Sequence, residues 1–327
     1  MVWDWQGSFD STMTEKDIEL YLAKLNDHNI KAMFLRANND FYKKIIPIAQ
    51  KVGIQIHAWR PTMVKAEKDF VEAHRDWYAV NKNNESCVDK PPYVGYYRWF
   101  CPNEPRVVEY LVNDYLELAK IDGIAGIHLD YIRYCDIFLP IGLQPQYNLI
   151  QDHEMPEYDY CYCSRCREGF KSEFGYDPLE RDDSVSQKQW LEWRLKSIVK
   201  IVDTISEAVK KQTGKYVTAA VFPTPQMSVD MVRQDWSKFQ IDAVFPMIYN
   251  GFYNEGVNWI GECVKEGIET MEYKKDLYAG VMVNNIAEPE QFSKAIKSAL
   301  DNGANGVVFF AAGNLTDEHF RIIKDYK

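Results

Sequence analysis

The segment 126–134 contains the residue types best suited to chemistry. His128, Asp130 and Arg133 lie close together there, at the end of an apolar run. A guanidinium beside a carboxylate favours the charged form of the acid. Burying such groups without partners would cost several kcal/mol apiece. We therefore expect these side chains to bind one another or a polar ligand.

In two other apolar runs, side chains alternate in direction, and this alternation predicts further polar groups near the same ends of the strands. In the run 54–60, His57 and Trp59 alternate with apolar residues, so they must point away from the side that packs on helices. Arg36, near the end of the run 31–37, also alternates with apolar residues and is expected to point away from the helices. In a single barrel, these groups would converge with those of the segment 126–134 at the carboxyl ends of the strands.

Eight apolar runs alternate with amphipathic segments along the chain. The predicted strands are Val2–Trp5, Lys31–Ala37, Ile54–Arg60, Gly126–Tyr134, Tyr216–Pro223, Ile241–Asn250, Asp276–Asn284 and Asn305–Gly313. The predicted helices are Glu15–Asn29, Asp40–Val52, Pro105–Ile121, Gln189–Gln212, Val229–Phe239, Asn258–Tyr273, Glu288–Asn302 and Asp317–Tyr326. This order predicts the α/β class, with residues 1–327 forming one (β/α)8 TIM barrel. A doubly wound open sheet is the alternative, but the glycine-rich turn it would normally carry after the first strand is absent.

The longest connection follows the fourth strand and is rich in Cys and Tyr. We expect residues 135–188 to form an insertion over the C-terminal face, where barrel enzymes build their sites. Cys161, Cys163 and Cys166 have the spacing of a structural zinc site. Cys135 or His153 could complete it, whereas in an oxidising compartment disulfides with Cys87 or Cys101 are the alternative.

The segment Gly126–Tyr134 resembles the fourth strand of the glycosidase-like barrels known as family-10-type or hypothetical glycosyl hydrolases. In these barrels an HxDxxR-like signature closes that strand. Similar passages are Cys101–Arg106, Phe245–Tyr249 and Cys161–Cys166, the last running on to Phe170, Phe174 and Gly175. The resemblance covers most of the chain. It implies a carbohydrate-active barrel, with Asp130 as the position most suited to catalysis.

Glycoside hydrolysis needs one ionised and one protonated carboxyl group. We assign Asp130 the ionised role and Glu255, in the loop after the sixth strand, the role of the acid. Asp4, Asp136 and Glu154 compete with Glu255. The residues expected to bind substrate are Asp4, Trp5, Arg36, His57, Trp59, His128, Arg133, Tyr249, Asn250 and Asn284.

Two other functions stay open from the sequence. The end of the sixth predicted strand, residues 245–250, contains no carboxylate, which would suit a non-catalytic carbohydrate-binding barrel. A metal-dependent hydrolase of another small molecule is the second, but two guanidinium groups at the same mouth would oppose a divalent cation. We therefore expect no catalytic metal and no cofactor.

Composition limits the partners of the chain. Lys and Arg total 38 against 48 Asp and Glu, a net charge of −10, which disfavours nucleic acid as a partner. No apolar run approaches the roughly 20 residues of a membrane-spanning helix. The N-terminus shows no targeting signal, which leaves open a cytoplasmic protein or a periplasmic or secreted protein whose leader is missing. The oligomeric state stays open.

Overall fold

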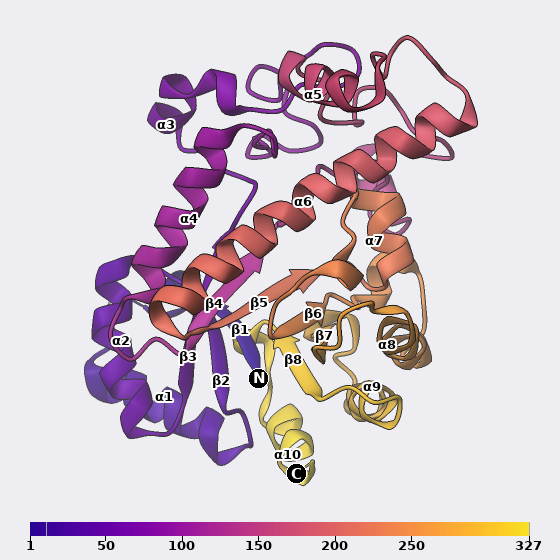
Figure 1. Ribbon diagram of the computed structural model, residues 1–327. Helices are drawn as coiled ribbons and strands as arrows, with labels where there is room; N and C mark the ends of the chain where they lie inside the picture. Colours follow the sequence, from indigo (N-terminus) through magenta and orange to yellow (C-terminus); the bar gives the residue numbers. More distant parts are fainter. Residues whose placement is uncertain (11, 327) are drawn as a thin grey trace.

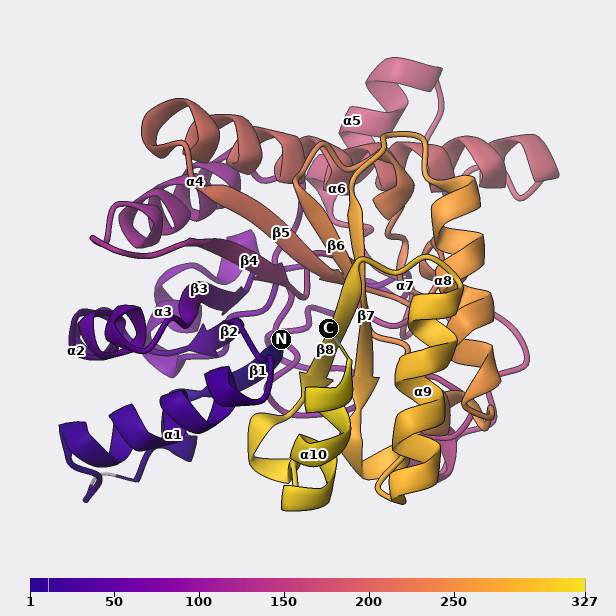
Figure 2. The same ribbon diagram turned by 90° about the horizontal axis from the view of Figure 1, so that it is seen from below.

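Eight parallel strands close into a barrel in the order β1 to β8, and the helices lie outside it (Figures 1 and 2). The structure is a computed structural model that describes residues 1–10 and 12–326. The strands are β1 Val2–Trp5, β2 Ala32–Arg36, β3 Gln55–Pro61, β4 Gly126–Asp130, β5 Tyr216–Val221, β6 Ala243–Pro246, β7 Asp276–Met282 and β8 Gly306–Phe310. The predicted (β/α)8 TIM barrel is confirmed.

Ten α-helices connect these strands in the part of the chain that the structure describes. They are α1 Glu15–Asp27, α2 Asn39–Lys51, α3 Lys68–Ala73, α4 Pro105–Ala119, α5 Ser164–Phe174, α6 Ser184–Thr213, α7 Pro225–Val232, α8 Asn258–Thr270, α9 Pro289–Asp301 and α10 Asp317–Asp325. The prediction missed α3, which has 6 residues, and α5, which lies within the expected insertion, and it placed α7 too late in the chain. Helix α7 begins early because Thr224 accepts a hydrogen bond from the N–H of Met227, and it ends at Arg233, whose φ is +50°.

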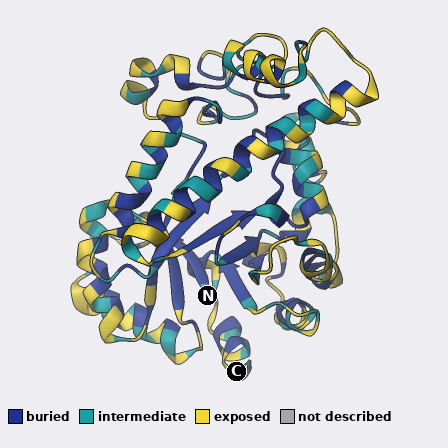
Figure 3. Cartoon of the chain, viewed as in Figure 1, coloured by how far each residue is buried: buried dark blue, intermediate teal, exposed yellow. Residues whose placement is uncertain are grey.

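The two sides of each strand pack against different layers, as alternation predicted. Ile56 and Ala58 of β3 belong to the large cluster between strands and helices, whereas Trp59 belongs to a smaller cluster inside the barrel. His128 of β4 contacts the interior ring of Phe34, with centroids 4.4 Å apart. Figure 3 shows the strands buried along their length, so the barrel interior is a packed core.

Helix α6 spans two parts of the molecule. It has 30 residues, which corresponds to about 45 Å, and Figure 1 shows it crossing from the region of α5 to the strands. Near its start, Trp190 packs edge-on against Phe170 of α5, at 5.1 Å between centroids. Farther along, Ile198 and Val202 join the cluster that covers the barrel. The helix therefore joins the segment after β4 to the barrel wall.

Candidate active site

A cavity of about 430 Å³ opens at the carboxyl ends of the strands. Its floor and inner wall come from strands, and its outer wall comes from the connections after β3, β4 and β6. The lining residues are Trp3, Trp5, Arg36, Trp59, Tyr97, Asp130, Tyr131, Arg133, Asp136, Leu139, Pro140, Leu143, Tyr147, Ala220, Phe222, Met247, Tyr249, Phe252, Tyr253, Met282 and Phe310. Carboxylates, guanidinium groups and aromatic rings thus share one concave space.

Asp130, the last residue of β4, is buried and contributes to the lining of this cavity. Its Oδ2 accepts a hydrogen bond from Trp59 Nε1 at 3.0 Å. Its Oδ1 accepts one from the backbone N–H of Tyr131 at 2.7 Å. Tyr131 has a left-handed backbone, φ +49°, and conformations of this kind in non-glycine residues cluster at functional sites.

Burial raises the pKa of the Asp130 carboxyl above its ordinary value. The bonds from Tyr131 and Trp59, and the charges of Arg133 and Arg36, act in the opposite direction but are smaller. Both arginines favour the charged form, as expected, but they do not decide the net direction of the shift. The physical reason is that the carboxyl group is buried, and desolvation penalises its charged form.

Asp136 is the partner of Arg133. Arg133 Nη1 donates to Asp136 Oδ2 at 3.0 Å and to the carbonyl of Tyr134 at 2.9 Å, and both side chains of the ion pair are buried. The guanidinium also lies over the ring of Trp99, 4.9 Å from its centroid. The cavity therefore contains one carboxylate held in an ion pair and one, Asp130, that is held by N–H donors.

Aromatic side chains form the apolar wall of the cavity. Trp59 and Tyr249 both contact Phe310, with ring centroids 6.4 and 5.8 Å apart. Trp5 lies at the rim, with 42% of its surface exposed. Flat rings of this kind, some of them partly open, suit the apolar faces of sugars. The structure thus brings together six predicted residues at the cavity: Trp5, Arg36, Trp59, Asp130, Arg133 and Tyr249.

The two predicted histidines lie inside the barrel and do not line the cavity. His128 Nε2 accepts a hydrogen bond from Trp3 Nε1 at 3.0 Å, and His128 Nδ1 lies 2.8 Å from Thr218 Oγ1. Burial lowers the pKa of His57 to about 4, and its Nδ1 is buried without a hydrogen-bond partner among the described residues. Both ring nitrogens of His128 are occupied, so it is a core residue rather than a substrate or metal ligand.

Asp4 points away from the cavity, contrary to the prediction. Its Oδ2 accepts a hydrogen bond from the hydroxyl of Tyr21 on α1, at 3.0 Å, because alternation places this residue of β1 on the helix side. Its own Oδ1 accepts from the N–H of Trp5 at 2.9 Å. Asp4 therefore anchors α1 to the barrel.

Glu255 is exposed and is not among the cavity-lining residues. The loop closes on itself, because Glu255 N donates to Asn250 O at 3.0 Å and Asn250 Nδ2 donates to Glu255 O at 2.9 Å. This turn occupies the Asn250 side chain as well, and Asn284 is exposed outside the cavity. The predicted roles of Glu255, Asn250 and Asn284 therefore gain no support from their positions. Of the other competing acids, Glu154 pairs with Arg233, also outside the cavity.

Several cavity residues were not predicted. Tyr97, Leu139 and Leu143 come from irregular segments and Tyr147 from a single 3-10 turn, so their side chains have no periodicity to reveal their direction. Asp136 was predicted only as a competitor of Glu255. Its signal was present in the sequence, since it follows Arg133 by three residues and could form the ion pair now seen.

Four cysteine sulfurs gather between the connections that follow β3 and β4. The Sγ atoms of Cys101, Cys161, Cys163 and Cys166 all lie within 4.8 Å of one another. The sequence predicted Cys101 only as a disulfide partner, whereas the predicted alternatives Cys135 and His153 lie outside this group. His153 is exposed and contacts Asp152 instead. Within residues 1–10 and 12–326, no other group of His, Cys, Asp or Glu has the proximity of metal ligands.

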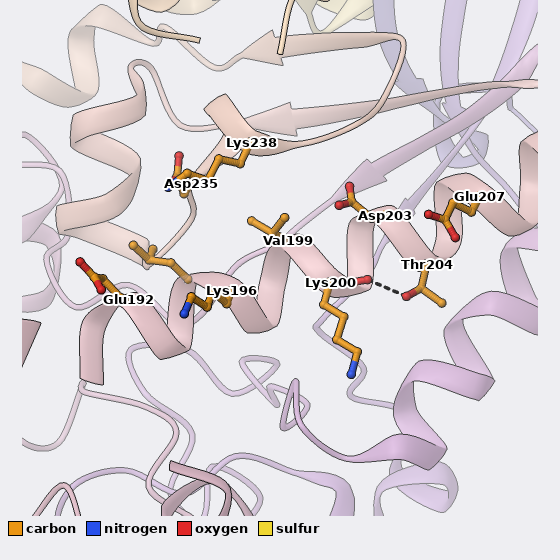
Figure 4. A pocket seen from close by; sticks show the side chains of 10 residues that line it. Glu192, Lys196, Val199, Lys200, Asp203, Thr204, Glu207, Asp235 and Lys238 are labelled. Carbon is orange, nitrogen blue, oxygen red and sulfur yellow. Dashed lines mark hydrogen bonds and ion pairs between the residues drawn. The ribbon is translucent and has the colours of Figure 1, made fainter. Parts of the chain in front are cut away.

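A second depression, of about 580 Å³, lies along α6 (Figure 4). Its acidic and basic side chains are mostly solvated, and its buried acid Asp235 accepts a bond from Ser237 Oγ and pairs with Lys238 at 2.8 Å. The depression is lined by α6 and by Asp235 and Lys238, which precede β6, so no residue from the carboxyl end of a strand contributes to its lining. The cavity at the strand ends is therefore the candidate active site.

One known protein family matches most of the chain. The family described as Glycosyl hydrolase-like 10 matches residues 15–298. None of the curated proteins matches the sequence.

Solved structures of glycoside hydrolases share the fold. The glycoside hydrolase domain of PgaB (BpsB) from Bordetella bronchiseptica superposes with a TM-score of 0.73 at 11% identity, over 98% of this chain and 94% of that one. The catalytic domain of β-amylase from Paenibacillus polymyxa superposes with a TM-score of 0.63 at 12% identity, over 99% of this chain and 96% of that one. A class V chitinase from Pseudomonas fluorescens superposes with a TM-score of 0.55 at 12% identity, over 100% of this chain and 99% of that one. At such identities the similarity establishes the fold alone. Among the described helices, none has the length and apolar character of a membrane span.

Proposed function

The chain belongs to the Glycosyl hydrolase-like 10 family, and from this premise we propose that it hydrolyses O-glycosidic bonds of an oligo- or polysaccharide in the cavity at the strand ends. One observation carries the proposal. Asp130 ends β4 inside an aromatic-walled cavity, with its carboxyl group held by N–H donors and, among the described residues, free of an ion pair. The carboxyl ends of barrel strands are where enzymes of this fold place catalytic groups.

We assign Asp130 the role of proton donor, which reverses the role expected from the sequence. Burial raises its pKa, and a raised pKa keeps a carboxylic acid protonated closer to neutral pH. The protonated acid would donate its proton to the glycosidic oxygen as the bond to the leaving sugar breaks. Both oxygens accept hydrogen bonds from N–H donors, so the orientation of the carboxyl group is set before substrate binds.

Asp136 is the second carboxylate of the proposal. It lines the same cavity and forms a buried ion pair with Arg133. In the charged form it would stabilise the oxocarbenium-like centre or accept a proton from the attacking water, the role that the second carboxylate has in most glycoside hydrolases. Trp5, Trp59 and Tyr249 would bind the apolar faces of the sugar rings.

A panel of aryl glycosides with leaving groups of different acidity tests these roles. If Asp130 is the proton donor, Asp130→Asn lowers kcat/KM strongly for poor leaving groups and only slightly for the most acidic phenols, which leave without protonation. Glu255→Gln is the matched control and keeps wild-type activity. Equal losses for all leaving groups would contradict the donor role, and loss of activity in Glu255→Gln would return that residue to the site.

A non-catalytic carbohydrate-binding barrel is the second candidate. The ion pair with Arg133 favours it, because it partly neutralises the only other carboxylate among the described residues that line the cavity. Calorimetry with oligosaccharides separates the two functions. Binding that is equal in the wild type and Asp130→Asn, with no turnover by either protein, would support the binding role and exclude hydrolysis.

A further inference from the structure

The four clustered sulfurs have the geometry of a single tetrahedral metal centre. Cys101 Sγ lies 3.5 Å from Cys163 Sγ and 3.5 Å from Cys166 Sγ, and the whole group of four is within 4.8 Å. Zn²⁺ binds thiolates at about 2.3 Å, and a tetrahedron of that size has edges of about 3.8 Å. Clusters of several iron atoms need wider cysteine cages, so the spacing favours one ion.

Disulfides explain this arrangement less well. None of the seven cysteines forms a disulfide in the structure, and Cys101 Sγ lies equally far from the sulfurs of Cys163 and Cys166. A disulfide would bring one pair together at about 2.0 Å and separate it from the others. Four sulfurs at similar mutual distances instead surround a common point.

The surroundings of the sulfurs supply N–H donors of the kind that stabilise metal-bound thiolates. Asn103 Nδ2 donates to Cys166 Sγ, and the backbone N–H of Val80 donates to Cys161 Sγ, each at 3.5 Å. Asn103 is held in place by Ser197 of α6, whose hydroxyl donates to its Oδ1 at 3.1 Å. Cys163 and Cys166 also lie at the N-cap and in the first turn of the 11-residue helix α5, where free N–H groups favour negative charge.

We propose that Cys101, Cys161, Cys163 and Cys166 bind one structural Zn²⁺ ion. Four thiolates fill the coordination shell, which is typical of structural rather than catalytic zinc. The ion would join two connections that are far apart in the sequence, since Cys101 follows β3 and the other three cysteines follow β4. The first connection contributes Tyr97 to the cavity and the second contributes Asp136, so the ion would fix two parts of the cavity wall relative to each other.

Metal analysis of the full chain, purified without added metal or chelator, tests the proposal directly. We expect about one zinc per chain, four sulfur neighbours at about 2.3 Å by X-ray absorption, and all seven cysteines reacting as thiols after denaturation. Three outcomes would overturn the proposal: no zinc with seven free thiols, a thiol count reduced by disulfides, or iron in place of zinc.

Two variants test the ligands, with a third as control. Cys163→Ser, at the least buried of the four sulfurs, should lose the zinc, whereas Cys263→Ser in α8 should keep it. Asn103→Ala preserves all four ligands, so it should fold and weaken zinc affinity about tenfold. If Cys163→Ser does not fold, replacing the bound zinc by Co²⁺ in the wild type tests the four ligands instead. A four-thiolate site gives intense sulfur-to-cobalt charge-transfer bands. Their absence, or full zinc in Cys163→Ser, would refute the site.

Discussion

Replacing Trp59 by Phe should raise the pKa of Asp130 without changing its burial greatly. The substitution keeps an aromatic ring in the wall and removes the indole N–H that donates to Asp130 Oδ2 at 3.0 Å. Because this bond stabilises the charged carboxylate, its loss favours the protonated acid.

The size of the effect can be worked out from the strength of that bond. A hydrogen bond to a charged group contributes about 1.5–3 kcal/mol, and one pKa unit corresponds to about 1.36 kcal/mol. The pKa of Asp130 should therefore rise by about 1–2 units. The bond from Tyr131 N–H remains and limits the increase.

The titration can be measured without knowledge of the substrate. Protein labelled with ¹³C at the aspartate carboxyl groups would be titrated by NMR, with Asp130→Asn to assign the signal. Trp5→Phe is the matched control, since this tryptophan lines the same cavity and has no hydrogen bond to Asp130 among the described contacts. A shift below about 0.5 units, under ~0.7 kcal/mol, or an equal shift in Trp5→Phe, would refute the reasoning.

The remaining predictions concern activity and stability. If Asp130 is the proton donor, kcat/KM should fall as pH rises through its raised pKa, so the basic limb should lie above the ordinary range for aspartate, and Trp59→Phe should move that limb to still higher pH. Phe34→Ala should lower the free energy of unfolding by about 3–5 kcal/mol in urea denaturation, because the ring is 1% exposed inside the barrel, and a loss below ~1 kcal/mol would mean that the interior is loosely packed. Burial lowers the pKa of His57 to about 4 against an ordinary 6.5, so the unfolded chain binds the proton first and stability falls as pH drops from about 6.5 to 4, by ~3 kcal/mol for this group. His57→Gln should flatten that part of the stability–pH curve, and an unchanged slope would show that the group titrates normally.

Alternation along the strands explains why the fold and the inner half of the site could be predicted. A strand has only two sides, so the apolar residues Ile56 and Ala58 fixed the direction of Trp59, and the same argument placed Asp130 at the barrel mouth. Asp4 was proposed from its place at the end of the first strand and not from alternation, which puts it on the opposite side to Trp3, facing the helices.

Most of the outer half of the site could not be predicted, because it depends on contacts between segments far apart in the sequence; the local spacing of Arg133 and Asp136 is the exception. Glu255 and Asp136 are both loop acids in the sequence, and only the turn at Asn250 and the ion pair with Arg133 distinguish them. Cys101 and Cys166 are 65 positions apart, and nothing local to either residue indicates that their sulfurs meet.

The continuity of α6 limits how this chain can vary in length. Each residue added to a helix rotates the remainder of that helix by about 100°, so a single insertion between Trp190 and Ile198 would turn one of these side chains away from its cluster. Additions of seven residues, close to two full turns, would restore the facing but move α5 outward by about 10 Å. Length changes that preserve activity should therefore fall in the irregular segments above the strand ends. The length of α6 fixes the distance between α5 and the barrel.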